Sequence, residues 1–298
     1  MATRGDSQVV DGAASVVVVE TRKWRALKAL LHNPTAAGGI VIVVAWVVIA
    51  LTVQWWTPYG PIDQDVVNRL QPPSTGHWFG TDHLGRDVLS RVVCASQVSL
   101  PLVIIVAGGS LLIGGSIGAL VGFIGGAIDD IAMRIADITL AFPSIVLAMA
   151  IITATGPGLN NAMIAMLIVG WPQYARLMRG QVLSMKRKEH VEAARSLGVP
   201  EGRILLRHVV PLCVSPVIVA VTLDLGNVLL LAAALSFIGL GAVPPTPEWG
   251  SMVAEGRTKF LQWWVAGAPG LAITSLVLGF NFIGDGLRDA LDPRFKSR

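Results

Sequence analysis

Residues 99–124 read SLPLVIIVAGGSLLIGGSIGALVGFI, a run without a single charged side chain. A helix needs about 20 predominantly apolar residues to cross the hydrocarbon core of a bilayer. Backbone amides left unpaired in hydrocarbon cost several kcal/mol each, so a run of this kind must be helical. The stretch therefore predicts a membrane-spanning helix, and it indicates that the rest of the chain should be searched for more.

Small residues recur at every fourth position of this run and continue just beyond it, at Ser110, Gly114, Gly118, Gly122 and Gly126. Residues four apart lie along one helix face, and small side chains there let a second helix approach closely. We interpret the four glycines as a helix-packing face. A smooth contact that slides during transport is the alternative.

Five further apolar runs resemble the first in length. They cover residues 36–56, 139–155, 159–176, 209–239 and 264–284. Of the 298 residues, 53% are hydrophobic and only 14% are charged, and the mean hydropathy is +0.64. Soluble domains carry about 25% charged residues. The predicted fold class is therefore an all-α polytopic membrane protein with about six transmembrane helices.

The distribution of lysine and arginine predicts the orientation, because cytoplasmic loops carry an excess of both. The segments between the runs 36–56 and 99–124 and between the runs 209–239 and 264–284 hold few basic residues. These are Arg69, Arg86, Arg91, Arg257 and Lys259. The opposite segments are much richer in basic residues, especially between 176 and 207. We therefore expect both chain termini in the cytoplasm, and residues 57–97 and 240–263 outside.

These patterns divide the chain into four predicted parts. Residues 1–24 are expected to be a disordered cytoplasmic tail, and 25–95 an N-terminal region with the first transmembrane helix and an external segment. Residues 96–289 would form the transmembrane domain, with five helices and a cytoplasmic loop at 188–211. Residues 290–298 would be a cytoplasmic C-terminal tail.

The loop at 188–211 reads KEHVEAARSLGVPEGRILLRHVVP, which predicts a helix–turn–helix. Good helix formers fill 188–197, Gly198 supplies a C-terminal stop, and Pro200 suits the first turn of the next helix. Charged side chains would face outward from a small apolar ridge. The ridge consists of Ala193, Ala194, Leu197, Ile204 and Leu205. Such a surface predicts docking to a partner.

This loop resembles the EAA loop of ATP-binding-cassette (ABC) importer permeases. Glu192, Ala193, Ala194, Gly198 and Pro211 match that pattern by position, whereas His208 and Val210 depart from its general ending and are similar to the peptide-importer branch. Further stretches are similar to the dipeptide/oligopeptide permease C subunits. They are 79–91, 141–144, 235–241, 244–250 and 284–293. The resemblance covers about residues 25–295.

The resemblance implies a type I ABC importer permease of the bacterial inner membrane, in the binding-protein-dependent transport family. Its partners would be a homologous second permease, two ATPase subunits or domains that bind ATP and Mg, and an extracytoplasmic substrate-binding protein. It also implies that Glu192, Ala193, Ala194 and Gly198 contact the ATPase, with Pro200 in the same coupling loop.

Several motifs of other function classes are absent from the sequence. It contains no Gly-x-x-x-x-Gly-Lys-Ser/Thr phosphate loop, no Gly-x-Ser-x-Gly elbow and no Cys/His cluster with metal-site spacing. We therefore expect a non-catalytic subunit without a cofactor of its own. The net charge of +4 is explained by the basic loops that flank the spans, without a nucleic-acid partner.

One acid does not fit an apolar span. Asp224 lies near the middle of the run 209–239, where a charge is costly and usually functional. We interpret Asp224, with Asn227, as lining a translocation path, where Asp224 interacts with a substrate amine or a partner-subunit cation. The alternative is an acid that is protonated or paired with Thr222 or Asn227, or that lies nearer the membrane interface.

The leading functional hypothesis is the import of short peptides. Glutathione, nickel or haem-type substrates remain alternatives within the same transporter class. A proton-coupled secondary transporter that uses Asp224 would predict inverted repeats, and we find no convincing repeat. A channel or membrane scaffold would need no coupling loop.

Overall fold

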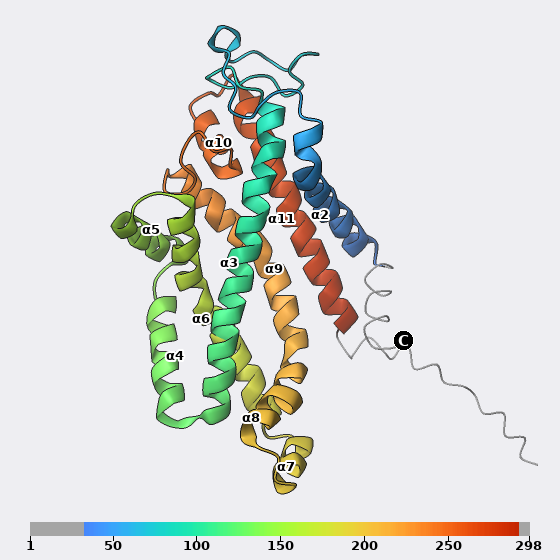
Figure 1. The fold of residues 1–298 in the computed structure, drawn as a ribbon, viewed down its shortest axis with the longest axis vertical. Coiled ribbons are helices and arrows are strands. Elements are labelled where there is room, and N and C mark those ends of the chain that lie inside the picture. The colour runs from blue at the N-terminus through green and yellow to red at the C-terminus, as the bar shows by residue number, and fades with distance from the viewer. Residues whose placement is uncertain (1–32, 292–298) are drawn as a thin grey trace, which may run out of the picture.

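The computed structural model of the chain describes residues 33–291, which confirm the expected all-α class (Figure 1). The only strand-like feature in this part is one isolated bridge between Thr81 and Asp87. The helices are α2 (Pro34–Thr52), α3 (Val88–Ile124), α4 (Gly126–Leu140), α5 (Ser144–Thr155), α6 (Leu159–Met185), α7 (Glu189–Ser196), α8 (Glu201–Ile204), α9 (Val210–Phe237), α10 (Trp249–Gly256) and α11 (Trp263–Leu291). Short turns η1 (Val53–Trp55), η2 (Val66–Asn68) and the π-helical η3 (Leu205–Val209) complete them.

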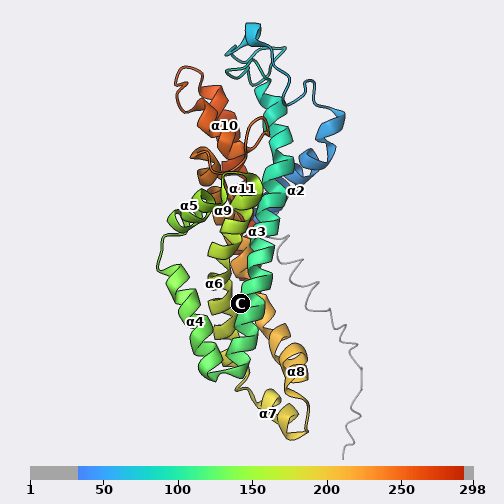
Figure 2. The ribbon, with the colours of Figure 1, turned by 60° about the vertical axis from the view of Figure 1, so that its left-hand side comes forward.

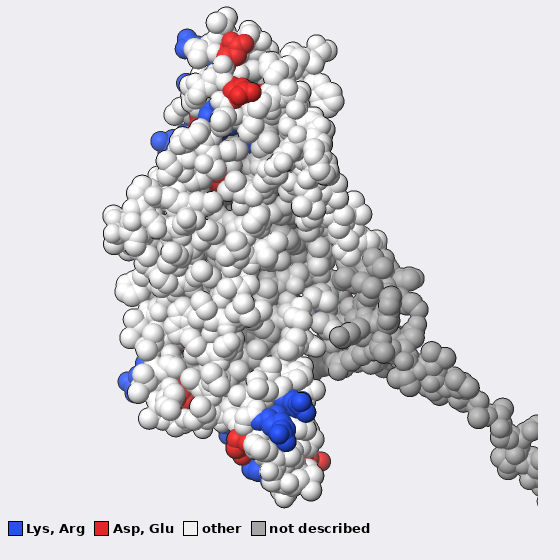
Figure 3. All heavy atoms as spheres, in the orientation of Figure 1, with Lys and Arg blue, Asp and Glu red and all other residues white. Residues whose placement is uncertain are grey.

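The long helices run between two ends of an elongated molecule (Figure 1). One, here called the cap end, carries residues 53–87 and α10, and the other, the hairpin end, carries α7 and α8. On the face shown in Figure 3, the charged side chains lie towards the two ends and leave a broad middle band almost free of charge. This arrangement suits a protein whose middle lies in hydrocarbon. The two segments predicted to lie outside thus share one end.

Within residues 33–291, four helical segments are long and apolar enough to cross a membrane. They are Pro34–Trp55, Val88–Ile124, Glu201–Phe237 and Trp263–Leu291. The bent pair α4 and α5 makes a fifth if it counts as one span. The predicted span at 159–176 corresponds to α6, whose 27 residues are long enough to cross, although polar residues such as Asn161 and Arg179 lower its hydropathy.

The predicted span at 139–155 is wrong as a single straight helix. It is broken at 141–143 into the end of α4 and the whole of α5, which meet at 91°. Pro143 explains the break, because proline disfavours helical backbone in the residue before it. With 12 residues, α5 is only about 18 Å long, too short to cross alone.

Helix boundaries follow from local caps. The carboxylate of Asp87 accepts a hydrogen bond from the Ser90 amide at 2.7 Å and starts α3, which begins at Val88 rather than near residue 99. Gly125, with φ of +78°, ends it. The predicted tail at 1–24 lies outside the described residues. Of the tail predicted at 290–298, residues 290–291 belong to α11, and 292–298 lie outside the described residues.

In the middle of the molecule, α3 packs closely on α6. A methyl group at Gly114 would lie 2.0 Å from the carbonyl oxygen of Trp171, and one at Gly118 would lie 2.1 Å from that of Ala175. At Gly122 it would lie 3.1 Å from the Arg179 side chain. The contact partners on α6 also recur every four residues, so two helix faces match in register.

Gly126 does not belong to this contact. No neighbouring atom lies within 4 Å of the position that its Cβ would take, and its φ is +69°. The expectation that it extends the packing face is wrong, because α3 ends at Gly125 and the chain reverses direction there. At this position, glycine serves the turn instead.

Candidate functional site

The turn at Gly198 gives the α7–α8 hairpin a defined shape. Gly198 has φ of +75°, its amide donates to the Arg195 carbonyl at 3.0 Å, and the Val199 amide donates to the Ala194 carbonyl at 3.2 Å. This pair of hydrogen bonds is the Schellman arrangement, in which a left-handed residue ends a helix. Pro200 then occupies the N-cap of α8. In Figures 1 and 2 the hairpin projects beyond the neighbouring ends of α3 and α4.

The apolar ridge predicted for the hairpin does not form one exposed surface. Ala194, Ile204 and Leu205 are buried, together with Val191 and Val209, in a cluster with α6 and α9. The prediction missed this because the helical pattern alone does not say which apolar face the rest of the chain covers. These residues anchor the hairpin to the helices that carry it.

What remains exposed on the hairpin is a smaller surface. Glu192 and Ala193 are exposed, Leu197 is 84% exposed, and Leu206 is 68% exposed. Arg195 binds Glu201 across the turn, with Nε–Oε1 at 2.7 Å. The hydrogen bond from Arg195 lowers the pKa of the Glu201 carboxyl, and the same bond raises the pKa of Arg195. The exposed surface thus combines apolar tips with ionised groups.

The hairpin is joined to the middle of the molecule by one continuous helical segment. Its second arm continues through η3 into α9, so that Glu201–Phe237 is one segment of 37 residues. Asp224 lies on this segment, about 35 Å along the helix axis from Glu201. The same continuous segment therefore links the hairpin to Asp224.

Asp224 lies at a cavity of about 310 Å³ that is walled by residues of α3, α4, α5, α6 and α9. The Tyr174 hydroxyl donates to its Oδ2 at 2.7 Å, and the Asn227 amide donates to its Oδ1 at 3.3 Å. Thr222, the other partner considered, instead donates to the Ile218 carbonyl. Asp224 and Asn227 both line the cavity, together with polar Ser110, Ser144 and Gln173.

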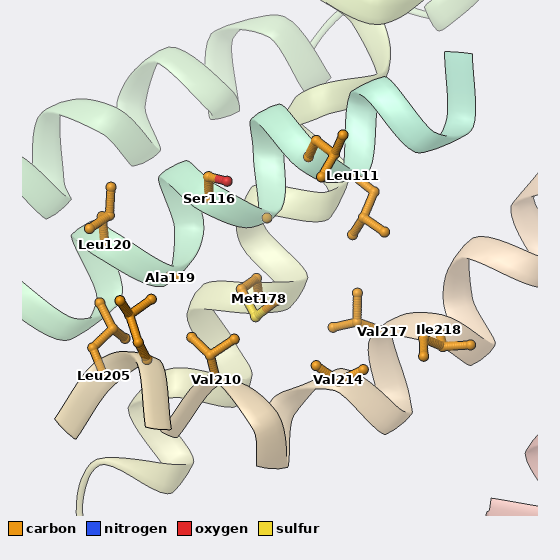
Figure 4. Close-up of a pocket in the computed structure, with 13 residues that line it drawn as sticks. Leu111, Ser116, Ala119, Leu120, Met178, Leu205, Val210, Val214, Val217 and Ile218 are labelled. Carbon is orange, nitrogen blue, oxygen red and sulfur yellow. The ribbon is translucent and has the colours of Figure 1, made fainter. Parts of the chain in front are cut away.

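A second hollow, of about 360 Å³, lies between α3, α6 and the start of α9, and Leu205 of η3 lines its lower edge (Figure 4). Side chains such as Leu111, Met178 and Val214 face it. Of the described residues that line it, Ser116 is the one with a polar side chain, and none is charged. A polar solute would find no partner for its charged groups here, so the cavity at Asp224 is the better candidate.

The cap end holds a buried cluster of ion pairs. Asp82 Oδ2 binds Arg86 Nε and Arg91 Nη1, each at 2.6 Å, and Glu255 of α10 binds Arg86 Nη2 at 2.9 Å. The charge pattern places both arginines in an external segment, and their side chains there are only 3% and 1% exposed. The cluster joins residues 82–91 to α10.

Asp82, His83 and Glu255 lie close enough together to hold a metal ion. Two arginines already neutralise the two carboxylates, however, and would repel a divalent cation. The donor set therefore fits an ion-pair cluster better than a metal centre.

Sequence reasoning missed Tyr174, Gln173 and Glu255. Tyr174 and Gln173 lie within the polar half of α6, and the available signal was a tyrosine and a glutamine inside a predicted span. Glu255 lies 164 residues beyond Arg91, and nothing local in the sequence pairs them. The predicted coupling residues lie at different places on the hairpin. Glu192 and Ala193 lie on its outer surface, Ala194 lies on its buried face, and Gly198 and Pro200 lie at the turn.

Comparison with known families and proteins agrees with this architecture. Residues 114–297 match the family described as "Binding-protein-dependent transport system inner membrane component". Residues 22–73 match the "N-terminal TM domain of oligopeptide transport permease C". A dipeptide transport system permease protein of Alkalihalophilus pseudofirmus is 45% identical over 92% of this chain and 91% of its own length. A glutathione transport system permease protein of Pectobacterium atrosepticum is 42% identical over 89% and 88%.

Among solved structures, an inward-facing methionine ABC transporter, MetNI, shares the fold with a TM-score of 0.57 at 20% sequence identity. The match covers 68% of this chain and 98% of that one. The fold is therefore that of a type I importer permease, as the resemblance implied. The matched family model covers more than half of the chain, and the two relatives align along nearly all of it. The chain belongs to the family of binding-protein-dependent transport system inner membrane components of ABC importers.

Proposed function

We propose that this chain is one permease subunit of an importer for dipeptides and related short peptides, and that ATP hydrolysed on separate subunits drives it. Its place would be the bacterial inner membrane. A homologous permease would complete the path, two ATPase subunits or domains would bind ATP and Mg, and an extracytoplasmic binding protein would deliver the substrate. In this assignment the chain itself performs no catalysis.

The observation that carries the proposal is the continuity of the α7–α8 hairpin with α9. Exposed Glu192, Ala193 and Leu197 form the docking surface for the ATPase, and the Gly198 turn fixes the surface's shape. The buried inner face transmits force because it packs on α6 and α9. Movement of the docked ATPase would thus tilt the helix that carries Asp224.

The substrate assignment is supported by the relatives. Those cited above are named for dipeptide and glutathione transport, and both solutes are small peptides or peptide-like molecules. A di/tripeptide transport permease of Pseudomonas aeruginosa is 42% identical over 89% of this chain. The polar cavity at Asp224 is large enough for part of such a solute.

The test is to purify the chain gently from its native membrane, identify what accompanies it, and reconstitute the complex in proteoliposomes. A Walker-type ATPase, a second permease and a binding protein should co-purify, and uptake of labelled glycyl-leucine should require hydrolysable ATP. An isolated homodimer that transports without ATP would overturn the proposal. Uptake that stops when a proton gradient is dissipated, but not when ATP is withheld, would favour a secondary transporter.

A further inference from the structure

We infer that Asp224, held by Tyr174, binds the free α-ammonium group of a peptide in transit through the cavity between α3, α4, α5, α6 and α9. This inference rests on the proposed import of short peptides and adds the chemical group that this chain recognises. It also assigns a role to Tyr174, which is a positioning residue for the acid.

The charge of the cavity selects a cation. Among residues 33–291, Asp224 is the one acidic residue that lines the cavity, and no lysine or arginine of this part lines it. The two arginines of α6 near this level are already paired, Arg176 with Asp137 and Arg179 with Asp129. A half-buried acid without a cationic partner among the described residues attracts a positive ligand.

The geometry leaves the carboxylate able to bind further. A carboxylate has about four acceptor sites, and the hydroxyl of Tyr174 and the amide of Asn227 occupy one on each oxygen. Tyr174 is 1% exposed, so its ring is fixed and its hydroxyl holds Oδ2 in place. An ammonium group carries three donors, and the remaining acceptor sites of Asp224 can take up some of them.

Other lining groups provide partners for the rest of a peptide. The Ser110 hydroxyl is buried without a hydrogen-bond partner in the described part of the chain, although Ser110 lines the cavity. Gln173 and Ser144 also line it and offer both donors and acceptors. A dipeptide and glutathione share a free α-ammonium group, so one site serves the whole peptide-like class.

The test compares two peptides in the complete reconstituted transporter, glycyl-leucine and N-acetylglycyl-leucine. For each peptide, uptake by a variant is divided by uptake by the parent protein, so that the preference of the binding protein cancels. Asp224→Asn should lower glycyl-leucine uptake about tenfold or more, because a charge-assisted hydrogen bond is lost. It should change N-acetylglycyl-leucine uptake much less. Asp224→Glu should retain the preference, and Asp130→Asn, an exposed acid on α4, is the matched control.

Equal reduction of both peptides by Asp224→Asn would overturn the inference and would favour a partner-subunit cation or a purely structural acid. Tyr174→Phe distinguishes positioning from packing, since it keeps the ring and the charge of Asp224. It should reduce glycyl-leucine uptake severalfold and leave N-acetylglycyl-leucine unchanged, and an equal effect on both would contradict the role of the hydroxyl.

A binding measurement covers the case in which the acetylated peptide is not taken up or Asp224→Asn does not assemble. The melting temperature of the permease–ATPase complex should rise with millimolar glycyl-leucine, but not with its acetylated form, in the parent and in Asp224→Glu. The rise should be smaller in Tyr174→Phe. No rise in the parent, or an equal rise with both peptides, would overturn the inference. If the parent protein shows no ATP-dependent uptake of glycyl-leucine, that result would instead count against the proposed function.

Discussion

Arg91 near the start of α3 binds Glu255 of α10 with Nη2–Oε1 at 3.2 Å, although 164 residues separate the two in the sequence. Arg91 also binds Asp82 at 2.6 Å, and its side chain is 1% exposed. The pair therefore ties the segment before α3 to α10 at the cap end. A buried charge must keep its partner, so this relationship leads to a direct prediction.

Arg91→Met should destabilise the protein by about 3–5 kcal/mol, because it leaves the buried carboxylate of Asp82 and the partly buried carboxylate of Glu255 with one cation fewer. The thermal midpoint of the detergent-purified complex measures the loss. Arg69→Met, at an exposed position of the same external segment, is the control and should have little effect. A midpoint for Arg91→Met equal to that of the control would contradict the cluster's structural role.

The N-cap of α10 predicts a pH dependence. Glu248 is 1% exposed, and its carboxylate accepts hydrogen bonds from the Gly250 and Ser251 amides, each at 2.9 Å. Burial raises the pKa of this carboxyl above its usual value. A raised pKa in the folded state gives stability that is fully present below the unfolded pKa of about 4.3 and is lost as pH rises through the folded pKa.

The thermal midpoint of the parent should therefore contain a component that falls as pH rises above about 4.3, and Glu248→Gln should lack it. The quantity to compare is the difference between the two proteins at each pH, since this removes the contributions of all other groups. A difference that stays constant across the range would show that burial of Glu248 does not control its protonation.

Helix packing predicts a contrast between two glycines of α3. Gly118→Ala places a methyl group 2.1 Å from the Ala175 carbonyl oxygen, so α3 and α6 must separate, at a cost of about 1–3 kcal/mol. Gly108→Ala meets nothing within 4 Å and should be neutral or slightly stabilising. Thermal unfolding of both purified variants measures the contrast. Equal midpoints would contradict the close approach of the two helices.

The hairpin turn predicts a graded series at Gly198. Gly198→Val forces a β-branched side chain into a left-handed conformation, at a cost of about 1–2 kcal/mol, and should uncouple ATP hydrolysis from uptake while the spans stay inserted. Gly198→Asn should be milder, because asparagine tolerates this conformation. Gly202→Ala is the control, since Gly202 has open space and lies in α8. Normal coupling in Gly198→Val would count against the hairpin as the coupling element.

How far the sequence predicts this molecule depends on the range of the interactions. Apolar runs and the Gly198–Pro200 turn are local signals, and the structure has helices or a turn at each of them. The break at Pro143 shows the limit of a hydropathy run, because such a run does not report a bend of 91°. The burial of Ala194 and Ile204 depends on α6 and α9, and the Arg91–Glu255 pair depends on the packing of α10. The sequence pattern within one segment predicts neither this burial nor this ion pair.

Asp224 illustrates the same division. The cost of a charge in an apolar span marks it from sequence alone, whereas its hydrogen bond from Tyr174 joins residues 50 apart on two helices. The cavity exists only because α3, α4, α5, α6 and α9 meet there. The identity of the acid was therefore predictable, but its partner and its setting were not.

The central claim is that the exposed tip of the α7–α8 hairpin docks on an ATPase subunit. A photo-crosslinking amino acid at position 197, where Leu197 is 84% exposed, tests it in the native membrane, with position 78 at the cap end as the control. We predict that light attaches residue 197, but not residue 78, to a protein that contains a nucleotide-binding ATPase domain. Crosslinking of residue 197 only to lipid or to an extracytoplasmic protein would contradict the account.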